Sequence, residues 1–120
     1  ARPLIYSTGL PPASVAAAIA ALHVIENDPA LVTKPVEKAR LFTRGLNLPL
    51  AQSPIVPLVL GKPEAALAAA QHLEDKGFLA VAIRPPTVPD GTARLRFAFT
   101  AGHDDADIAR LTEAVREILP

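Results

Sequence analysis

The sequence predicts an α+β fold: a small antiparallel or mixed three-stranded sheet with helices on one face, in the order β-α-β-β-α, preceded by an α-helical arm. Three observations lead to this prediction. Residues 78–83 form a short apolar run that ends at prolines, which is typical of a buried strand. Residues 94–99 alternate basic and apolar side chains, the pattern of a strand with one buried face. Residues 105–119 carry apolar side chains at helical spacing, so a helix can cover that face.

The arm consists of two predicted helices. The first covers residues 12–27, where alanines surround aliphatic residues at helical spacing and a proline occupies the first turn. An Asn-Asp-Pro sequence ends it. The second runs from Lys34 or Pro35 to Arg44, with Gly45 as the C′ residue. The alanines indicate either close packing on another helix or subunit, or simply a good helix former, and the pattern leaves both open.

A proline-containing connector, residues 46–54, follows the arm. We therefore predict two parts. Residues 1–52 form an extended segment and the helical arm, and residues 53–120 form a small C-terminal domain. At 120 residues the chain has the size of a single small domain.

The remaining elements of the C-terminal domain follow from local signals. Residues 55–60 read as a strand, and Pro57 predicts an edge strand or a bulge because proline cannot donate to a sheet ladder. A helix over residues 63–76 ends at a glycine. Asp104 or Asp105 is expected to cap the last helix.

The composition excludes several function classes. Twelve basic and twelve acidic residues cancel, so no net field favours nucleic acid or an anionic membrane. No stretch is long and apolar enough to span a bilayer. The absence of cysteine excludes a disulfide, a thiolate nucleophile and a sulfur-ligated metal, and it fits a reducing compartment, so we expect a cytoplasmic protein. Because the sequence has no methionine and begins abruptly, we expect a piece of a longer chain.

A stiff loop joins the last two predicted strands and carries Arg84 at its start. Pro85, Pro86 and Pro89 each fix a φ angle and remove a backbone donor, and an Asp-Gly turn pair follows. A guanidinium held in a fixed direction matches a carboxylate through two parallel hydrogen bonds. Arg84 is therefore a candidate carboxylate-binding residue, with a local ion pair to Asp90 as the alternative.

The other polar residues are assigned structural roles, and no catalytic residue or metal site is predicted. The sequence has no phosphate-binding glycine loop, nucleophile elbow or HExxH motif. The acidic residues at 104–107 begin a helix, where carboxylates complement the helix dipole. The lysines lack the apolar surroundings that Schiff-base chemistry needs. Arg94 and Arg96 are predicted to be solvated or ion-paired with a neighbouring domain. The histidines stand alone and are predicted at the surface or at caps: His23, His72 and His103.

Residues 84–96, Arg-Pro-Pro-Thr-Val-Pro-Asp-Gly-Thr-Ala-Arg-Leu-Arg, resemble the C-terminal domain of the α-oxoamine synthases. These are pyridoxal-phosphate enzymes of the aspartate-aminotransferase fold type. Residues 5–12, 53–57 and 100–103 also match, the last with a glycine where alanine is common. The resemblance covers essentially the whole chain in the right order. It is strongest to the family member of biotin biosynthesis, because residues 83–86 read Ile-Arg-Pro-Pro where glycine-using relatives tend to carry tyrosine-proline.

The resemblance implies a reaction, a cofactor and roles for four residues. With pyridoxal phosphate as electron sink, an L-amino acid, here L-alanine, condenses with an acyl-CoA or acyl-carrier thioester, here pimeloyl, and carbon dioxide is lost. Arg84 would hold the substrate carboxylate, and Thr87 would lie close to the acyl substrate. Ser7 or Thr8 would reach the cofactor phosphate of the other subunit of a homodimer.

The resemblance also implies that the Schiff-base lysine, the histidine that stacks on the cofactor ring and the aspartate that pairs with its nitrogen lie upstream. Residues 1–52 would then link to a large domain that this chain lacks. We expect the chain alone to show no catalysis and no stable cofactor binding, and to form oligomers through exposed apolar surface. Two other hypotheses stay open: a non-catalytic module that binds an amino acid through Arg84, and a dimerisation element built on the alanine-rich helix.

Overall fold

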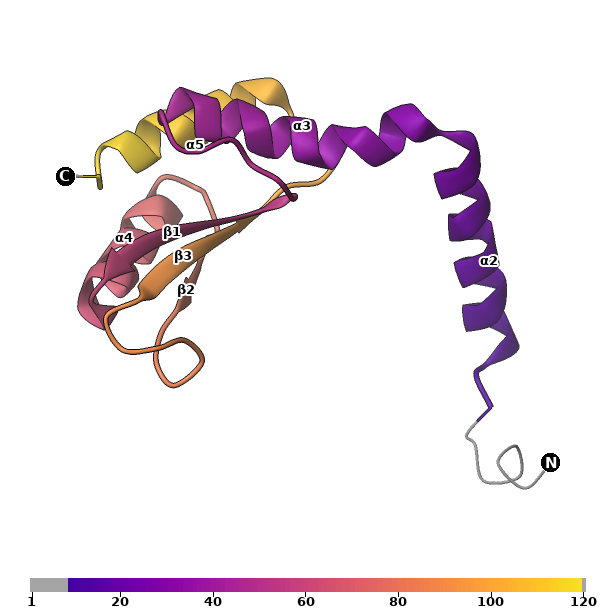
Figure 1. Cartoon of the computed structure of the whole chain (residues 1–120), viewed down its shortest axis with the longest axis horizontal. Coiled ribbons are helices and arrows are strands. Elements are labelled where there is room, and N and C mark those ends of the chain that lie inside the picture. Colours follow the sequence, from indigo (N-terminus) through magenta and orange to yellow (C-terminus); the bar gives the residue numbers. More distant parts are fainter. Residues whose placement is uncertain (1–8, 120) are drawn as a thin grey trace. The chain divides into compact units, whose positions relative to one another are not determined.

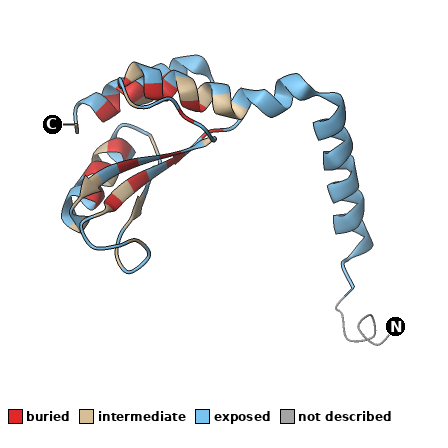
Figure 2. Ribbon diagram, viewed as in Figure 1, coloured by how far each residue is buried: buried red, intermediate tan, exposed pale blue. Residues whose placement is uncertain are grey.

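The computed structural model describes residues 9–119 (Figure 1). Its first helix is α2 (Pro12–Asn27). Its bounds match the prediction, and proline occupies its first turn. None of its residues is buried, as the uniform pale blue in Figure 2 shows. Within the described residues no single helix is long and apolar enough to cross a bilayer. Helix α2 and the next helix, α3 (Pro29–Gly45), pass that test together, by length and composition only, as a pair bent at a break.

Helix α3 (Pro29–Gly45) begins earlier than the predicted start at Lys34 or Pro35, which was wrong. The Oδ1 atom of Asp28 accepts the Leu31 N–H at 2.9 Å, so an Asp-Pro pair caps and starts the helix. The later proline lies inside the helix. Either proline, Pro29 or Pro35, could begin a helix by its sequence context. The helix begins at Pro29 because the side chain of Asp28 caps it there.

The role predicted for Gly45 also needs correction. Helix α3 does end there, but the left-handed backbone conformation falls on Asn47, with a φ of 54°. A Cβ atom at Gly45 would lie 2.7 Å from Cγ2 of Thr112. Glycine therefore serves the close approach of α3 to a second helix rather than a turn.

The sheet has three strands: β1 (Ile55–Gly61), β2 (Val81–Ile83) and β3 (Ala93–Ala98). Their order is β1-β3-β2, and both outer strands run antiparallel to β3, which decides between the antiparallel and mixed sheets that the sequence allowed. Pro57 lies on edge strand β1, as predicted, and the register shifts between Val59 and Gly61.

Strand β2 is shorter than the predicted residues 78–83. The reason lies in helix α4 (Pro63–Asp75), whose end captures the first part of that run. The Phe78 N–H donates to the Leu73 carbonyl at 2.8 Å, and Gly77 has a φ of 85°. Residues held by a helix terminus are not available to the sheet.

Helices α4 and α5 (Asp105–Arg116) and the C-terminal part of α3 pack on one face of the sheet (Figure 1). Asp104 caps α5, because its Oδ1 atom accepts the Ala106 N–H at 3.1 Å. The largest fully buried side chains of this core come from all layers: Phe42, Thr43, Leu73, Leu95 and Val115.

By contacts the chain divides into two units, Ala1–Val32 and Thr33–Pro120. The second unit includes most of α3, because Ala39 and Phe42 are buried against the sheet. The predicted division of the chain into a linking arm, residues 1–52, and a C-terminal domain, residues 53–120, stays a prediction.

Candidate functional site

A groove of about 420 Å³ lies where β2 runs into the proline loop. Residues 81–87 form most of its lining, and Arg96 reaches it from β3. The groove therefore brings together Arg84 and Thr87, the two substrate-binding candidates among the described residues.

The loop closes on itself in two places. The Thr87 N–H donates to the Arg84 carbonyl at 3.1 Å across a cis Pro85–Pro86 peptide. Further along, the Thr92 hydroxyl and N–H both donate to the Pro89 carbonyl, at 2.7 and 3.2 Å. Arg84 and Thr87 are thus held at the two ends of one tight turn, which agrees with the stiffness that the prolines predict.

Arg84 is exposed, and among the described residues it forms no ion pair with Asp90 or with any other carboxylate. Its guanidinium is accordingly available to an anion from outside this chain. A planar donor group in this situation binds carboxylate or phosphate oxygens.

Arg96 is a functional candidate that the sequence prediction set aside as solvated or paired with a neighbouring domain. In the sheet it lies between Pro57 on β1 and Val81 on β2, and its side is opposite the core. It is exposed, and no ion pair within the described residues involves it. The alternation of residues 94–99 gave its face, but only the register with Val81 reveals that it shares a groove with Arg84.

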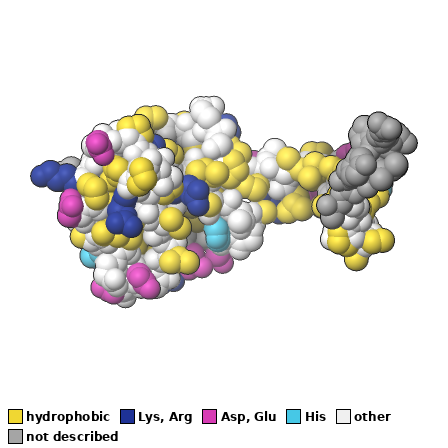
Figure 3. All heavy atoms as spheres, turned by 90° about the horizontal axis from the view of Figure 1, so that it is seen from below, with side chains coloured by type: hydrophobic (Ala, Val, Ile, Leu, Met, Phe, Trp, Pro, Cys, Tyr) yellow, Lys and Arg dark blue, Asp and Glu magenta, His cyan; other side chains and the backbone are white. Residues whose placement is uncertain are grey.

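Arg94 differs from Arg96 although both lie on the same face. Its Nε donates to the Thr92 carbonyl at 2.9 Å, and the residue is half-buried. Its cross-strand neighbours are Val59 and Ile83. Figure 3 shows one face of the protein, on which basic side chains lie among hydrophobic ones.

Ser7 and Thr8, the predicted cofactor-binding residues, lie outside the described residues. Their predicted role stays a prediction.

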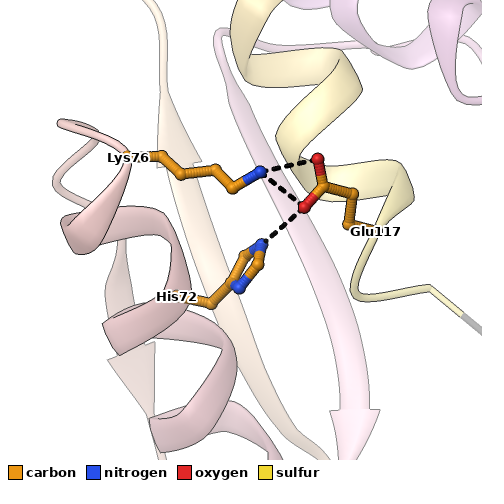
Figure 4. A network of polar contacts seen from close by, with 3 residues as sticks. All are labelled: His72, Lys76 and Glu117. Atoms are coloured by element: carbon orange, nitrogen blue, oxygen red, sulfur yellow. Dashed lines mark hydrogen bonds and ion pairs between the residues drawn. The ribbon is translucent and has the colours of Figure 1, made fainter.

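The histidines have local partners. His72 on α4 and Lys76, just after it, both contact Glu117, which follows α5 (Figure 4). Lys76 Nζ lies 2.6 Å from Oε1, and His72 Nε2 lies 3.1 Å from Oε2. The hydrogen bond from Lys76 holds the pKa of Glu117 below its ordinary value, with a smaller contribution from His72. No cluster of three or more metal-ligating side chains occurs in residues 9–119.

Comparison with known proteins identifies relatives over nearly the whole chain. The chain is 66% identical over 119 residues to 8-amino-7-oxononanoate synthase of Methylocella silvestris, and 60% identical over 120 residues to that of Beijerinckia indica. These alignments cover 99% and 100% of this chain but only 34% and 31% of the relatives. The chain thus spans about a third of the length of the curated relatives it matches.

Solved structures share the fold. A structure of SPT with PLP superposes with a TM-score of 0.85 at 29% identity, over 98% of this chain and 32% of the other. A structure of 8-amino-7-oxononanoate synthase from Francisella tularensis gives a TM-score of 0.74 at 24% identity, over 93% and 34%. The model of the family described as aminotransferase class I and II matches residues 1–115. The chain therefore belongs to the aminotransferase class I and II family.

Proposed function

We propose that this chain is part of an acyltransferase that condenses L-alanine with a pimeloyl thioester and releases carbon dioxide, as in biotin synthesis. The observation that carries the proposal is the 66% identity, along 99% of the chain, to a protein named 8-amino-7-oxononanoate synthase. The acyl group would arrive on CoA or on a carrier protein. We further propose a homodimer in the cytoplasm.

In this proposal the groove beside the proline loop holds substrate. Arg84 binds the substrate carboxylate through its unpaired guanidinium. Thr87, at the other end of the same turn, lies beside the acyl chain. Arg96 adds a second positive charge from the sheet, so the groove attracts anionic substrates before contact.

We propose pyridoxal phosphate as the cofactor of the whole protein, but the described residues do not fit its covalent attachment. Lys38 and Lys76 are engaged with Asp105 and Glu117, each at 2.6 Å. Lys34 and Lys62 are exposed. Attachment would need a lysine in an apolar site, which none of these provides. The part played by this chain's described residues is therefore substrate binding rather than cofactor chemistry.

The chain alone should accordingly be inactive. Adding pyridoxal phosphate to it should give no absorbance band of a lysine adduct, and no thiol should be released from pimeloyl-CoA. An adduct band from this chain would contradict the proposal that the cofactor is held elsewhere.

The site is tested in the whole protein with Arg84→Ala. Loss of the guanidinium should lower kcat/KM for L-alanine on the order of 100-fold, because a bound carboxylate then loses its charged partner. The assay follows release of the CoA thiol and of carbon dioxide. Arg44→Ala is the matched control: Arg44 is exposed, its Nε donates only to the carbonyl of Arg40 on the same helix, and its loss should leave kcat/KM unchanged.

Two failures can be told apart. If the unmodified whole protein releases no thiol with L-alanine and pimeloyl-CoA, the proposed reaction is wrong. If it does so and Arg84→Ala is as active, the reaction stands and the proposed carboxylate site is wrong.

A second candidate function, an assembly element, is favoured by α2. Val15, Ile19 and Leu22 are 38, 50 and 57% exposed, which is unusual for side chains of this type on one helix. Sedimentation of the chain across a range of concentrations would detect self-association, and the substitution Ile19→Glu should abolish it.

A further inference from the structure

A second hollow lies on the core side of β3, beyond the start of β2, and has a volume of about 280 Å³. It shares no lining residue with the groove of Arg84. Its lining is mostly apolar and comes from the segment after α4, from the end of β3 with the residue that follows it, and from α5: Phe78, Leu79, Phe97, Phe99, Ile108 and Leu111.

Leu79 is the most exposed of the large hydrophobic side chains in the described part of the chain, at 91%. It lies in the segment between α4 and β2, and it borders the hollow. An exposed leucine beside an apolar hollow is typical of a surface that another group covers.

The main chain of β3 is open at the same place. The ladder between β2 and β3 stops at the pair Val81 and Arg96, so Ala98 has no partner on β2. The Phe99 N–H donates toward β1, to the Pro54 carbonyl at 2.9 Å. Because successive residues of a strand direct their main-chain groups to opposite sides, the N–H and carbonyl of Ala98 face the side that β2 leaves uncovered.

Two polar side chains border the hollow with defined hydrogen-bonding roles. His103 Nδ1 accepts the Thr100 N–H at 3.1 Å, so in the neutral ring the proton lies on Nε2, which is a donor. Asp107 is an acceptor and bonds Arg110 Nη1 at 2.8 Å. The hollow thus has a hydrogen-bond donor, an acceptor and an open strand edge at its border. The main chain of an extended polypeptide can pair with the strand edge while one of its side chains fills the apolar hollow.

We propose that an extended segment of the whole protein, from the part beyond these 120 residues, pairs with Ala98 and inserts an apolar side chain into this hollow. The whole protein has room for such a segment, because this chain spans only 34% of the length of the Methylocella relative. A segment of the same chain acts at a high effective concentration, which favours it over a second copy or a separate peptide. This site is independent of the proposed substrate groove.

The test uses the whole protein with Leu79→Cys, and the labelled thiol is located by peptide mass. Leu67→Cys on α4 is the matched control, since Leu67 is 45% exposed and lies outside the hollow. If the segment covers the hollow, the thiol at position 79 should react about tenfold more slowly than the thiol at 67, although Leu79 is the more exposed residue here.

Reaction at 79 as fast as at 67 would overturn the proposal. Protection that disappears on dilution would also overturn it, because a second copy would then be the cover. Hydrogen exchange supplies the main-chain readout: the amide of Ala98 should be protected in the whole protein. A slow thiol at 79 with a rapidly exchanging Ala98 amide would mean a side-chain cover only, and would overturn the extended segment.

Discussion

The two faces of β3 carry neighbouring residues of one strand and yet have opposite properties. On one face Leu95 and Phe97 are 0 and 5% exposed, and the Phe42 ring packs against Phe97 with centroids 4.9 Å apart. On the other face Arg96 is exposed, lies in a groove and has no ion pair within the described residues. Apolar burial stabilises the fold through the first face, and the second carries the groove that we propose binds substrate.

This difference explains how one short strand can serve both purposes. A period of two separates the faces completely, so a change on the open face leaves the core untouched. Substitutions on the covered face should therefore act on stability, and those on the open face on binding.

The largest effect is expected for Leu95→Ala on the covered face. Leu95 is fully buried in the core cluster, to which all three helices that cover the sheet contribute, so its truncation leaves a cavity. The free energy of unfolding should fall by about 2–5 kcal/mol, measured by urea unfolding.

Val81→Ala on the open face is the control, because Val81 is 47% exposed. It should change stability by about 0.5 kcal/mol or less. Equal losses for the two variants would mean that both faces are covered in solution, and the comparison would fail.

A smaller loss is expected for Gly45→Ala, which tests the packing of α3 on α5. Alanine would ordinarily strengthen a helix by up to about 1 kcal/mol over glycine. Here its Cβ would lie 2.7 Å from Cγ2 of Thr112, and overpacking of this kind costs about 1–3 kcal/mol. We expect a net loss in urea unfolding.

Combining Gly45→Ala with Thr112→Ser tests whether the Thr112 methyl group causes that loss. Serine lacks the clashing methyl group but keeps a hydroxyl that can donate to the Ile108 carbonyl, as Thr112 does at 2.7 Å. In the double variant the loss caused by Gly45→Ala should shrink or reverse. If Gly45→Ala stabilises the protein with Thr112 intact, the helices can move apart and the close approach is not a constraint.

A smaller and pH-dependent effect is expected for Glu117→Gln. Because Lys76 lowers the pKa of Glu117 below its ordinary value of 4.5, the carboxylate contributes stability above that pH. The contribution is lost as the pH falls through the lowered pKa. The two proteins should therefore differ in urea midpoint near pH 7 and converge in acid.

Glu74→Gln provides the reference for that measurement, since it removes a charge from the exposed side of α4 and leaves Lys76 and its partner in place. Its urea midpoint should follow the wild type at both pH values. A difference for Glu117→Gln that persists in acid would show that the glutamine itself, and not the lost charge, disturbs the end of α5.

Much of this arrangement followed from local sequence signals. The alternation of residues 94–99 predicted the two faces of β3, and Pro57 predicted an edge strand, because each depends on rules that act within a few residues. The bounds of α2 followed from its proline and the Asn-Asp-Pro stop.

What the sequence could not supply was contact between distant residues. The reason for Gly45 depends on Thr112, and the shortening of β2 depends on a hydrogen bond from Phe78 to the end of α4. The place of Arg96 in the groove depends on its register with Val81. None of these contacts produces a pattern within a few residues of sequence. The alternation therefore predicted on which face of β3 Arg96 lies, but not which residues of other strands lie beside it.

Arg96→Ala is expected to have the smallest effect on stability and therefore tests the open face most sharply. Its exposed guanidinium has no ion-pair partner in the described residues, so the free energy of unfolding should change by about 0.5 kcal/mol or less. In the whole protein, however, loss of this charge should raise KM for an anionic substrate, and higher ionic strength should reduce the difference from wild type, because screening weakens the attraction that both arginines of the groove exert. Wild-type KM values at both low and high salt would exclude Arg96 from the site and leave Arg84 as its sole cationic candidate among the described residues.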